Sequence, residues 1–372
     1  MYIDAIDLFL VRHPLKRPWR TAYGSDSEIL SVIVQMHSGS QSAWSESSPL
    51  AMPTYSPEFA QGVYYLNSEL FAPLVVGQEI DDATQIGVLF QHFKGNPFGK
   101  AAIEMAWWAL ESQLRQIPLH TLLGGSDGAV AVGADFGIQD SLDELVRLVG
   151  TAVDSGFSRV KLKASRGWDY EVVKTIRSNF PNLMIHIDCN CGYTLEDLAF
   201  FQSLDRFDLA MIEQPLHYGD LRDHAFLQKH IATPLCLDES CNSPRAAHEA
   251  IELGSCKYMN IKPGRVGGIG NSLLIHDACR DAGIGCWIGG MLESSVGVGM
   301  LLELATLDNI VYPNDIFPSS YLYAEEISEK ELVLSGPGLM QPSLIAGTEY
   351  TPVPERLKER TIAHKRVEPI KK

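Results

Sequence analysis

The stretch Val160-Lys161-Leu162-Lys163 begins a ladder of charged residues that recurs at a nearly constant interval. Four further residues continue the ladder at steps of 25, 25, 25 and 24 residues, and these are Asp188, Glu213, Asp238 and Lys262. Lys163 and each of the four follow a short, mostly apolar run, at 158–162, 183–187, 208–212, 233–237 and 257–261. Helix-like segments separate the runs, so the pattern predicts repeated strand–helix units.

Parallel strands linked by helices at this period form either a doubly wound open sheet or a closed barrel. In barrels, catalytic side chains come from the C-terminal ends of several different strands, whereas an open sheet gathers its ligand contacts at one switch point. A single charged residue after a strand can mean only that the chain has reached water there. This explanation does not account for three acidic residues that lie between lysines, each at the same place after its apolar run. We therefore predict an α/β fold built on a TIM-like barrel.

The motifs of the ladder resemble those of the enolase superfamily. They are Lys-x-Lys at 161–163, Asp-x-Asn at 188–190, Glu-Gln-Pro at 213–215, Asp-Glu-Ser at 238–240 and Asn-Ile-Lys-Pro-Gly-Arg-Val-Gly-Gly at 260–268. Further stretches along nearly the whole chain are similar to the muconate-lactonizing-type subgroup, in the branch of o-succinylbenzoate synthase and N-succinylamino acid racemase. These stretches lie at 44–46, 53–56, 94–97, 137–139, 167–169 and 289–294.

The resemblance implies a (β/α)7β TIM-like barrel with an N-terminal α+β capping domain that the C-terminal tail completes. We divide the chain into a capping domain with a lid loop (1–125), a barrel with a metal site (126–320) and a C-terminal segment that returns to the capping domain (321–372). Barrel strands outside the ladder are expected at 130–136, at 284–287 and near 310–312. Residues 365–372 are expected to be a frayed, solvated end.

The first 125 residues contain both strand and helix patterns. Strand-like runs lie at 3–11, 29–36 and 41–46, with a polar loop at 14–27. A helix is predicted to begin after Asn96-Pro97, because Asn can cap a helix and Pro suits the first helical position. One face of this helix is predicted from residues at steps of three or four, namely Ile103, Trp107, Leu110, Leu114 and Ile117.

Composition narrows the class of protein. The 372 residues include 30 basic and 46 acidic residues, a net charge of −16, which argues against nucleic acid or an anionic membrane as a partner. No stretch is apolar enough over a sufficient length to span a bilayer, and early charges such as Asp4 and Arg12 are incompatible with a signal-peptide core. We expect a cytoplasmic homo-oligomer that acts on a small-molecule carboxylate substrate.

All seven cysteines lie between Cys189 and Cys286. Their odd number and the lack of a Cys-x-x-Cys motif predict neither a disulfide framework nor a structural zinc site. Cys189 and Cys191 flank Asn190 in the expected metal loop, but we interpret them as small packed residues and not as ligands.

Asp188, Glu213 and Asp238 offer only oxygen ligands, which favours a hard divalent cation. We predict Mg²⁺, with Mn²⁺ able to substitute. Three carboxylates on an octahedral ion leave positions for a substrate carboxylate, whose charge the ion would stabilise. Pairing with neighbouring lysines would explain one or two of these acids, but it would not explain why all three recur at the same interval after their apolar runs.

Lys163 and Lys262 are the predicted acid–base residues. Removing a proton α to a carboxylate produces an enediolate, and enolase-superfamily sites use a Lys or His base with Mg²⁺ for this step. Because the two lysines end strands two and six of an eight-stranded ring, we expect them on opposite faces of the substrate. Lys161 lies on the same strand face as Lys163, where its like charge is expected to lower the pKa of Lys163.

Three residues near the ladder are predicted to support it. Asn190 and Glu239 would orient the metal ligands or the lysines. Arg265, three residues after Lys262, would either tune that lysine electrostatically or be an ordinary surface arginine.

Two loops are expected to contact the substrate. The loop at 14–27, which contains Trp19 and Tyr23, resembles the mobile lid of the family, which would exclude water and contact the distal end of the substrate. The segment after the seventh strand, with Met291, Glu293 and Ser294, is expected to approach the substrate through backbone groups.

Two positions depart from the family pattern. Asp135 stands in the first barrel strand where a serine is common, and Ser-Val-Gly-Val at 295–298 replaces a more usual Gly-Leu-Gly-Arg. An extra carboxylate near an anionic substrate is unfavourable, so Asp135 bears on the choice of substrate more than on the type of reaction.

The resemblance implies Mg²⁺-dependent abstraction of an α-proton to give a metal-stabilised enediolate. The first expectation is o-succinylbenzoate synthase activity, the syn dehydration of 2-succinyl-6-hydroxy-2,4-cyclohexadiene-1-carboxylate in menaquinone biosynthesis. The alternative is N-succinylamino acid racemase, or another racemase, epimerase or cycloisomerase of the same subgroup. A non-catalytic barrel protein is a further alternative, but it predicts decay of the carboxylates and lysines, which are all present.

Overall fold

Seven short parallel strands form the sheet that the ladder predicts. The computed structural model describes residues 1–21 and 24–369. Each parallel strand pairs with the next one along the chain, in the order β11-β10-β9-β8-β7-β6-β5, as in a barrel wall. All five predicted runs contain a strand, which confirms this part of the fold. The strands are β5 (Ala134–Phe136), β6 (Arg159–Lys163), β7 (Met184–Asp188), β8 (Met211–Glu213), β9 (Leu235–Leu237), β10 (Tyr258–Ile261) and β11 (Gly285–Ile288).

Residues 309–315 close the ring, although they do not form a regular strand. On one side Ile310 forms a single parallel bridge with Cys286 of β11, and on the other side Asn314 bridges Val132. Pro313 lies between these two points and has no backbone N–H, which interrupts a continuous ladder. The strand predicted near 310–312 is therefore in the right place, but it is reduced to isolated bridges.

The predicted first barrel strand, 130–136, is split in two. β4 (Val130–Ala131) pairs with β12 (Leu339–Met340), and β5 pairs with β6 in the barrel. Between β4 and β5, a Cβ atom on Gly133 would lie 2.1 Å from Cζ of Arg159. Gly133 therefore makes room for an arginine that is fully buried inside the barrel.

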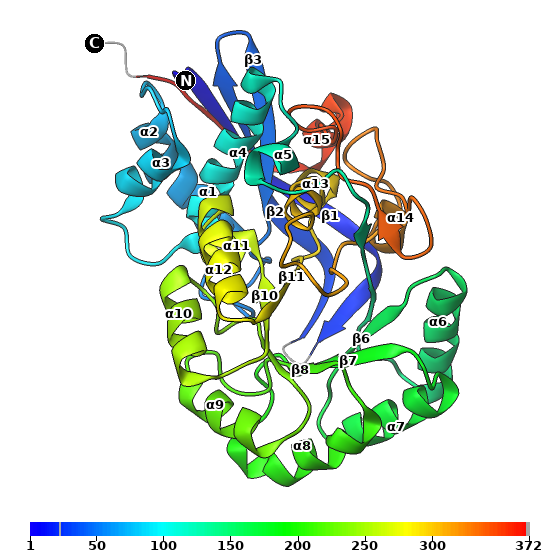
Figure 1. Ribbon diagram of the computed structural model, residues 1–372. Coiled ribbons are helices and arrows are strands. Elements are labelled where there is room, and N and C mark those ends of the chain that lie inside the picture. Colours follow the sequence, from blue (N-terminus) through cyan, green and yellow to red (C-terminus); the bar gives the residue numbers. More distant parts are fainter. Residues whose placement is uncertain (22–23, 370–372) are drawn as a thin grey trace.

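Helices surround the parallel sheet, as the green and yellow part of Figure 1 shows. Four of them have an N-cap residue whose side chain accepts a hydrogen bond from a backbone N–H of the first turn, and these residues are Ser141, Asp220, Ser243 and Ser294. The helices are α6 (Leu142–Asp154), α7 (Asp169–Asn179), α8 (Leu198–Leu204), α9 (Leu221–His230), α10 (Pro244–Leu253), α11 (Pro263–Val266), α12 (Ile269–Asp281) and α13 (Ser295–Leu304), with the 3₁₀ turns η2 (Leu195–Asp197) and η3 (Asp205–Phe207) beside α8.

An antiparallel sheet with the order β13-β1-β2-β3 forms the second lobe. Its first three strands cover the predicted runs, and they are β1 (Ala5–Thr21), β2 (Gly24–Ser38) and β3 (Gln41–Ser47). The helices of this lobe are α1 (Ala60–Leu66), the π-helix η1 (Asn67–Phe71), α2 (Ala72–Val75), α3 (Ala83–Phe90), α4 (Pro97–Arg115) and α5 (Leu119–Leu123). The chain later adds α14 (Ser319–Leu322), α15 (Pro354–Arg360) and β13 (Thr361–Val367). The lobe is the predicted α+β capping domain.

The prediction of a polar loop at 14–27 is wrong, because strands β1 and β2 continue through most of these residues. Their pairing shifts register between Pro14 and Trp19 and then resumes, with Trp19 opposite Asp26 and Thr21 opposite Gly24. Two antiparallel strands satisfy each other's backbone groups, so a polar sequence can extend as a hairpin beyond the sheet. Figure 1 shows this hairpin reaching from the capping domain to the barrel.

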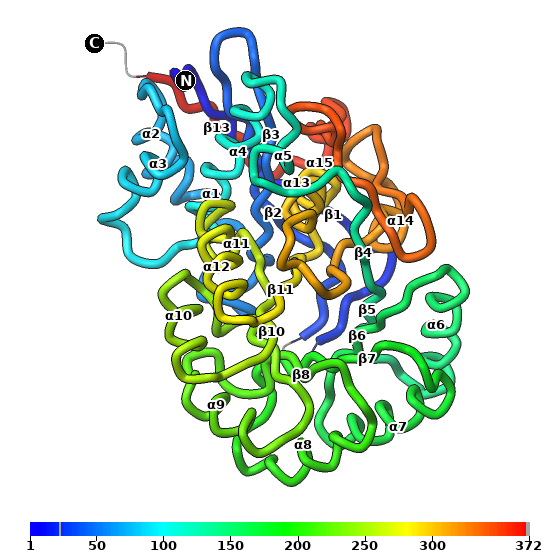
Figure 2. The backbone as a smooth tube through the Cα atoms, in the orientation of Figure 1, coloured from blue at the N-terminus to red at the C-terminus, as the bar shows by residue number. Residues whose placement is uncertain are grey.

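The C-terminal tail completes the capping domain, as the family resemblance implied. β13 pairs with β1, and Figure 2 shows the red and blue segments side by side. The expectation of a frayed end is wrong for residues 365–367, which belong to β13. Asp7 accepts hydrogen bonds from Arg366 at 2.5 Å and from His364 at 2.8 Å, which ties the tail to the first strand.

Helix α4 begins at Pro97 as predicted, but Asn96 does not cap it with its side chain. The carboxylate of Glu58 accepts the backbone N–H groups of Phe98 and Gly99 instead, at 2.9 and 3.0 Å. The predicted apolar face is confirmed at Ile103, Trp107 and Leu110, which are buried, whereas Leu114 is 40% exposed. The apolar stripe thus ends one turn before the helix does.

Two buried glutamates of the capping domain accept hydrogen bonds from the first turns of barrel helices. Glu104 of α4 accepts the N–H groups of Ile269 and Gly270 in α12, both at 2.8 Å. Glu46 of β3 accepts the N–H of Gly297 in α13 at 3.0 Å. A carboxylate is stabilised at a helix N-terminus, where N–H groups have no partner within the helix. These contacts therefore join the two domains.

Two exclusions drawn from the sequence can be compared with the structure. Within residues 1–21 and 24–369, no helix has the length and apolar character needed to cross a membrane. All seven cysteines are free thiols, which confirms that the chain has no disulfide framework.

We expect Glu104→Gln to lower the free energy of unfolding by about 1–3 kcal/mol, because the amide would place an N–H group against a buried backbone donor and leave it unpaired. Urea unfolding measures the change. Glu252→Gln, at an exposed position of α10, is the matched control and should change the free energy by less than about 0.5 kcal/mol. Equal effects of the two substitutions would contradict the role given to Glu104.

Candidate active site

Three carboxylates gather at the C-terminal ends of three neighbouring strands. Asp188 ends β7 and Glu213 ends β8, and the two residues are paired in register. Asp238 directly follows β9. All three are buried, with at most 2% of each residue exposed. The parallel register of the strands therefore brings together the acids that the ladder singled out.

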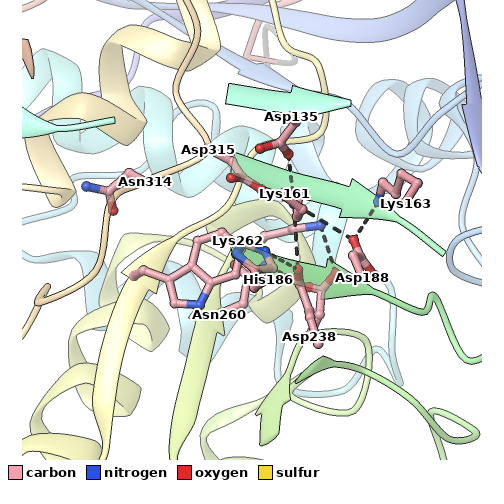
Figure 3. Close-up of polar contacts among 12 residues, drawn as sticks. Asp135, Lys161, Lys163, His186, Asp188, Asp238, Asn260, Lys262, Asn314 and Asp315 are labelled. Atoms are coloured by element: carbon pink, nitrogen blue, oxygen red, sulfur yellow. Dashed lines mark hydrogen bonds and ion pairs between the residues drawn. The ribbon is translucent and has the colours of Figure 1, made fainter. Parts of the chain in front are cut away.

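Two lysines lie against these carboxylates, as Figure 3 shows. The Nζ atom of Lys163 is 2.5 Å from Oδ2 of Asp188, and the Nζ atom of Lys262 is 2.9 Å from Oδ2 of Asp238. Lys163 ends β6, and Lys262 directly follows β10. The structure thus places both lysines at the same end of the barrel as the three acids.

The third lysine of the ladder, Lys161, points into a cluster of carboxylates. Its Nζ atom forms an ion pair with Asp315, lies 2.9 Å from Asp135, 3.6 Å from Glu213 and 3.8 Å from Asp188. Burial lowers the pKa of Lys161, but these negative charges outweigh burial and raise the pKa well above its usual value. Lys161 therefore carries the positive charge that the sequence analysis assigned to it, and its effect on the pKa of Lys163 stays a prediction.

Asp315 and Arg159 were missed by the sequence analysis. Arg159 is fully buried, and its guanidinium binds Asp135 and Asp315, each at 2.6 Å. Asp315 is the last residue of the segment that closes the ring, so the rule that each strand ends in a charge, extended to the eighth position, points to it. Asp135, the departure from the family pattern, is thus paired with two cations inside the barrel.

The three ladder carboxylates fit a divalent cation in donor type. Oε2 of Glu213 is buried and accepts no hydrogen bond, while the Nζ atom of Lys161 lies 3.6 Å and Nε2 of His186 lies 3.4 Å from it. This oxygen therefore keeps a lone pair that a cation could use. Burial raises the pKa of Glu213, but Lys161 and His186 outweigh it and hold this pKa well below its usual value, so the group is ionised. In the described part of the chain, no three His, Cys, Asp or Glu side chains converge on one metal-binding point, because Asp188 and Asp238 turn toward lysines.

Asn190 lies beside Lys163, and Glu239 lies beside Asn190. Oδ1 of Asn190 accepts a hydrogen bond from Lys163 at 3.0 Å, and Nδ2 of Asn190 donates to Oε1 of Glu239 at 3.1 Å. Burial raises the pKa of Glu239 to about 7, and the charge of Asp188 adds to this shift. Hydrogen bonds therefore connect Glu239, in the loop after β9, to Lys163 through Asn190.

Arg265 is buried at the site, so its interpretation as an ordinary surface arginine is wrong. It forms an ion pair with Asp238, and its Nη1 donates to the hydroxyl of Tyr55 at 3.0 Å. Tyr55 comes from the capping domain, and the Nζ atom of Lys262 lies 4.6 Å from the centroid of its ring. Burial lowers the pKa of Lys262, but Tyr55 and Glu213 outweigh it and raise the pKa above its usual value.

The segment after β11 lies at the site, but two of its backbone N–H groups are already bonded. The N–H of Met291 donates to Glu293 at 2.7 Å, and the N–H of Ser294 donates to Glu46 at 3.1 Å. The side chain of Met291 is closer to the site, since its Sδ atom is 3.6 Å from the Nζ atom of Lys262. The expectation that these backbone groups reach a substrate therefore has no support at Met291 and Ser294.

The hairpin of β1 and β2 covers the lysines. A cavity of about 40 Å³ is lined by Trp19 together with Lys161, Lys163, Lys262 and other residues around the carboxylates. The backbone carbonyl of Arg20 accepts the N–H of Ile138 at 3.2 Å, which fastens the hairpin to the barrel. Small-molecule sites usually measure about 300–1,000 Å³, so the hairpin closes the site. The predicted lid residue Tyr23 lies outside the described residues.

Comparisons with known proteins agree with this geometry. Residues 5–124 match the family described as mandelate racemase / muconate lactonizing enzyme, N-terminal domain, and residues 144–343 match the enolase C-terminal domain-like family. An N-succinylamino acid racemase of Thermus thermophilus is 39% identical over 89% of this chain and 90% of its own length. An o-succinylbenzoate synthase of Geobacillus kaustophilus is 36% identical over 93% of each chain.

A solved structure is also similar over nearly its whole length. It is a member of the enolase superfamily from Listeria innocua, with a TM-score of 0.95 and 32% sequence identity over 99% of each chain. The agreement covers both domains, so the capping domain and the barrel have the same arrangement in the two proteins.

We expect Glu213→Gln to leave a folded protein that binds Mg²⁺ at least about tenfold more weakly, because the change removes a charged ligand from a set of three. Titration calorimetry measures the affinity, and circular dichroism verifies the fold. Glu249→Gln, at an exposed site on α10, should leave the affinity unchanged. Unaltered Mg²⁺ binding by Glu213→Gln would exclude Glu213 as a ligand.

Proposed function

Because this chain belongs to the mandelate racemase / muconate lactonizing enzyme family of the enolase superfamily, we propose that it abstracts the proton α to a substrate carboxylate with the help of Mg²⁺. Enzymes of this family act on small carboxylates and generally use a divalent metal ion. The particular reaction that we propose is the dehydration performed by o-succinylbenzoate synthases.

One observation supports this proposal most directly. Lys163 and Lys262 line the same closed cavity, and they come from strands that are four places apart in the sheet. In a ring of eight positions, side chains four places apart face each other across the mouth. A substrate between them would therefore have one amine on each face.

In the dehydration, Lys163 acts as base and then as acid. Its neutral amine takes the α-proton of 2-succinyl-6-hydroxy-2,4-cyclohexadiene-1-carboxylate, which leaves an enediolate. The resulting ammonium then gives a proton to the hydroxyl group on the same face, so that water departs and the aromatic product of menaquinone biosynthesis forms. Lys262 stays charged on the opposite face and stabilises the negative charge of the enediolate.

Asp188, Glu213 and Asp238 are the residues that would hold the cation. When bound, Mg²⁺ supplies positive charge to the carboxylate from which the proton is removed. The hairpin with Trp19 excludes water from the small cavity, which strengthens each electrostatic contact inside it.

Racemisation of N-succinylamino acids is the second candidate. It is favoured by the 39% identity to the Thermus thermophilus racemase and by the presence of a lysine near each face. In this reaction one lysine removes the α-proton and the other returns a proton from the opposite side. Both reactions use the same amines and the same carboxylates.

We expect the two lysines to respond differently to substitution by arginine, which stays protonated and cannot act as a base. For dehydration, Lys163→Arg should abolish turnover, whereas Lys262→Arg should keep measurable turnover because it keeps the charge. Product formation measured by absorbance with purified substrate and Mg²⁺ checks both. Loss of all activity in Lys262→Arg with retention in Lys163→Arg would reverse the assigned roles.

For racemisation, either substitution should stop the overall reaction. Each variant should still exchange the α-proton of one enantiomer with deuterated water, because one working base remains, and proton NMR measures this exchange. If both variants exchanged the same enantiomer, the lysines would not lie on opposite faces.

A further inference from the structure

The two lysines are supported by different parts of the protein. Lys262 lies over the ring of Tyr55, which the capping domain supplies, and against Asp238. Lys163 lies against Asp188 and also meets Asn190, which the loop after β7 supplies, and Asn190 meets Glu239 in the loop after β9. The charge of Glu239 also acts on Lys262, whereas the hydrogen-bonded path through Asn190 leads to Lys163.

Glu239 lies on the far side of Asn190 from the catalytic cavity. Asn190 lines the small catalytic cavity and also a larger cavity of about 970 Å³ between the capping domain and the barrel loops, whereas Glu239 is among the lining residues of the larger one. Glu239 is 7% exposed, and its Oε2 atom has no hydrogen-bond partner. A substitution at Glu239 therefore changes the support of Lys163 without reshaping the wall of the catalytic cavity.

The amide of Asn190 has one orientation that satisfies both neighbours. Its oxygen must face the ammonium of Lys163, which can only donate, and its nitrogen must then face the carboxylate, which accepts. The backbone of Asn190 has a φ of 41°, a left-handed conformation that asparagine tolerates better than most residues. Its own N–H donates to Oδ1 of Asp188 at 3.1 Å. The loop thus holds the amide at a fixed place beside the lysine.

We propose that Glu239, acting through Asn190, is a positioning residue for Lys163 and sets the rate of proton transfer on that lysine's face of the substrate. This inference rests on the proposed function, since it assumes that the two lysines serve opposite faces. Misplacement of a reacting group by about 1 Å can cost on the order of 100-fold in rate. If Lys163 were less firmly positioned, exchange of the α-proton on its face of the substrate would therefore be slower.

The test compares exchange from the two faces. Each enantiomer of N-succinylleucine is incubated with enzyme and saturating Mg²⁺ in deuterated water, and proton NMR follows the initial loss of the α-proton. The enantiomer that Lys163→Arg no longer exchanges defines the face of Lys163. We expect Glu239→Ala to slow exchange of that enantiomer by about 10- to 100-fold and to change the other by less than about threefold.

Two further variants separate positioning from other effects. Glu239→Gln keeps an oxygen that can accept from Asn190, so it should restore most of the exchange. Asn190→Gly suits the left-handed backbone and should reproduce the one-sided loss even if Glu239→Ala folds poorly. Asn242→Ala, in the wall of the same outer cavity, is the control and should leave both faces unchanged.

The outcomes distinguish this inference from the proposed function. Weakened metal binding or loose packing would slow the exchange of both enantiomers equally in Glu239→Ala and Asn190→Gly. That result overturns the positioning role. Exchange by the unaltered enzyme would still uphold the proposed function. No exchange of either enantiomer by the unaltered enzyme, together with no dehydration, overturns the proposed function itself.

Discussion

The barrel depends on buried ion pairs at the place where its ring closes. Backbone pairing at this seam consists of isolated bridges and of the hydrogen bond from the N–H of Asp315 to the carbonyl of Ile288, without a continuous ladder, because Pro313 interrupts the eighth segment. Arg159 and Lys161 both bind Asp135 of the first strand and Asp315 of the last segment. Buried charges are costly unless each is paired, and here two cations face two acids. Side chains therefore join the two edges that the backbone joins only weakly.

The ion pairs at the seam also explain why the two lysines of the Lys-x-Lys motif have different roles. Both lysines line the cavity beneath the hairpin, but Lys161 forms ion pairs with Asp135 and Asp315, whereas Lys163 lies against Asp188 and Asn190. The capping domain completes the site from the other side. Tyr55 lies beside Lys262 and Trp19 closes the cavity, while Glu46 and Glu104 bind the first turns of barrel helices. Neither domain forms the site alone.

The strand ladder was predictable because each strand end combines an apolar run with one charged residue at a constant step. Features that depend on distant pairing were not. The polar residues of the hairpin gave no sign of strand structure, because the two strands satisfy each other's backbone groups. The burial of Arg265 follows from Asp238 and Tyr55, which lie far from it in sequence. Asp315 was missed because it lies three residues beyond the run predicted near 310–312, whereas each residue of the ladder directly follows its run.

The pairing of β13 with β1 also determines when the capping domain can form during synthesis. Asp7 and His364, which bond to each other in the finished sheet, are 357 residues apart. At synthesis rates of about 5–20 residues per second, the first strand leaves the ribosome roughly 20–70 seconds before its partner. The edge of β1 that accepts β13 stays open during that time, while the barrel segments emerge one after another. We therefore expect the barrel to fold first, and the capping sheet to be completed only after β13 has emerged from the ribosome.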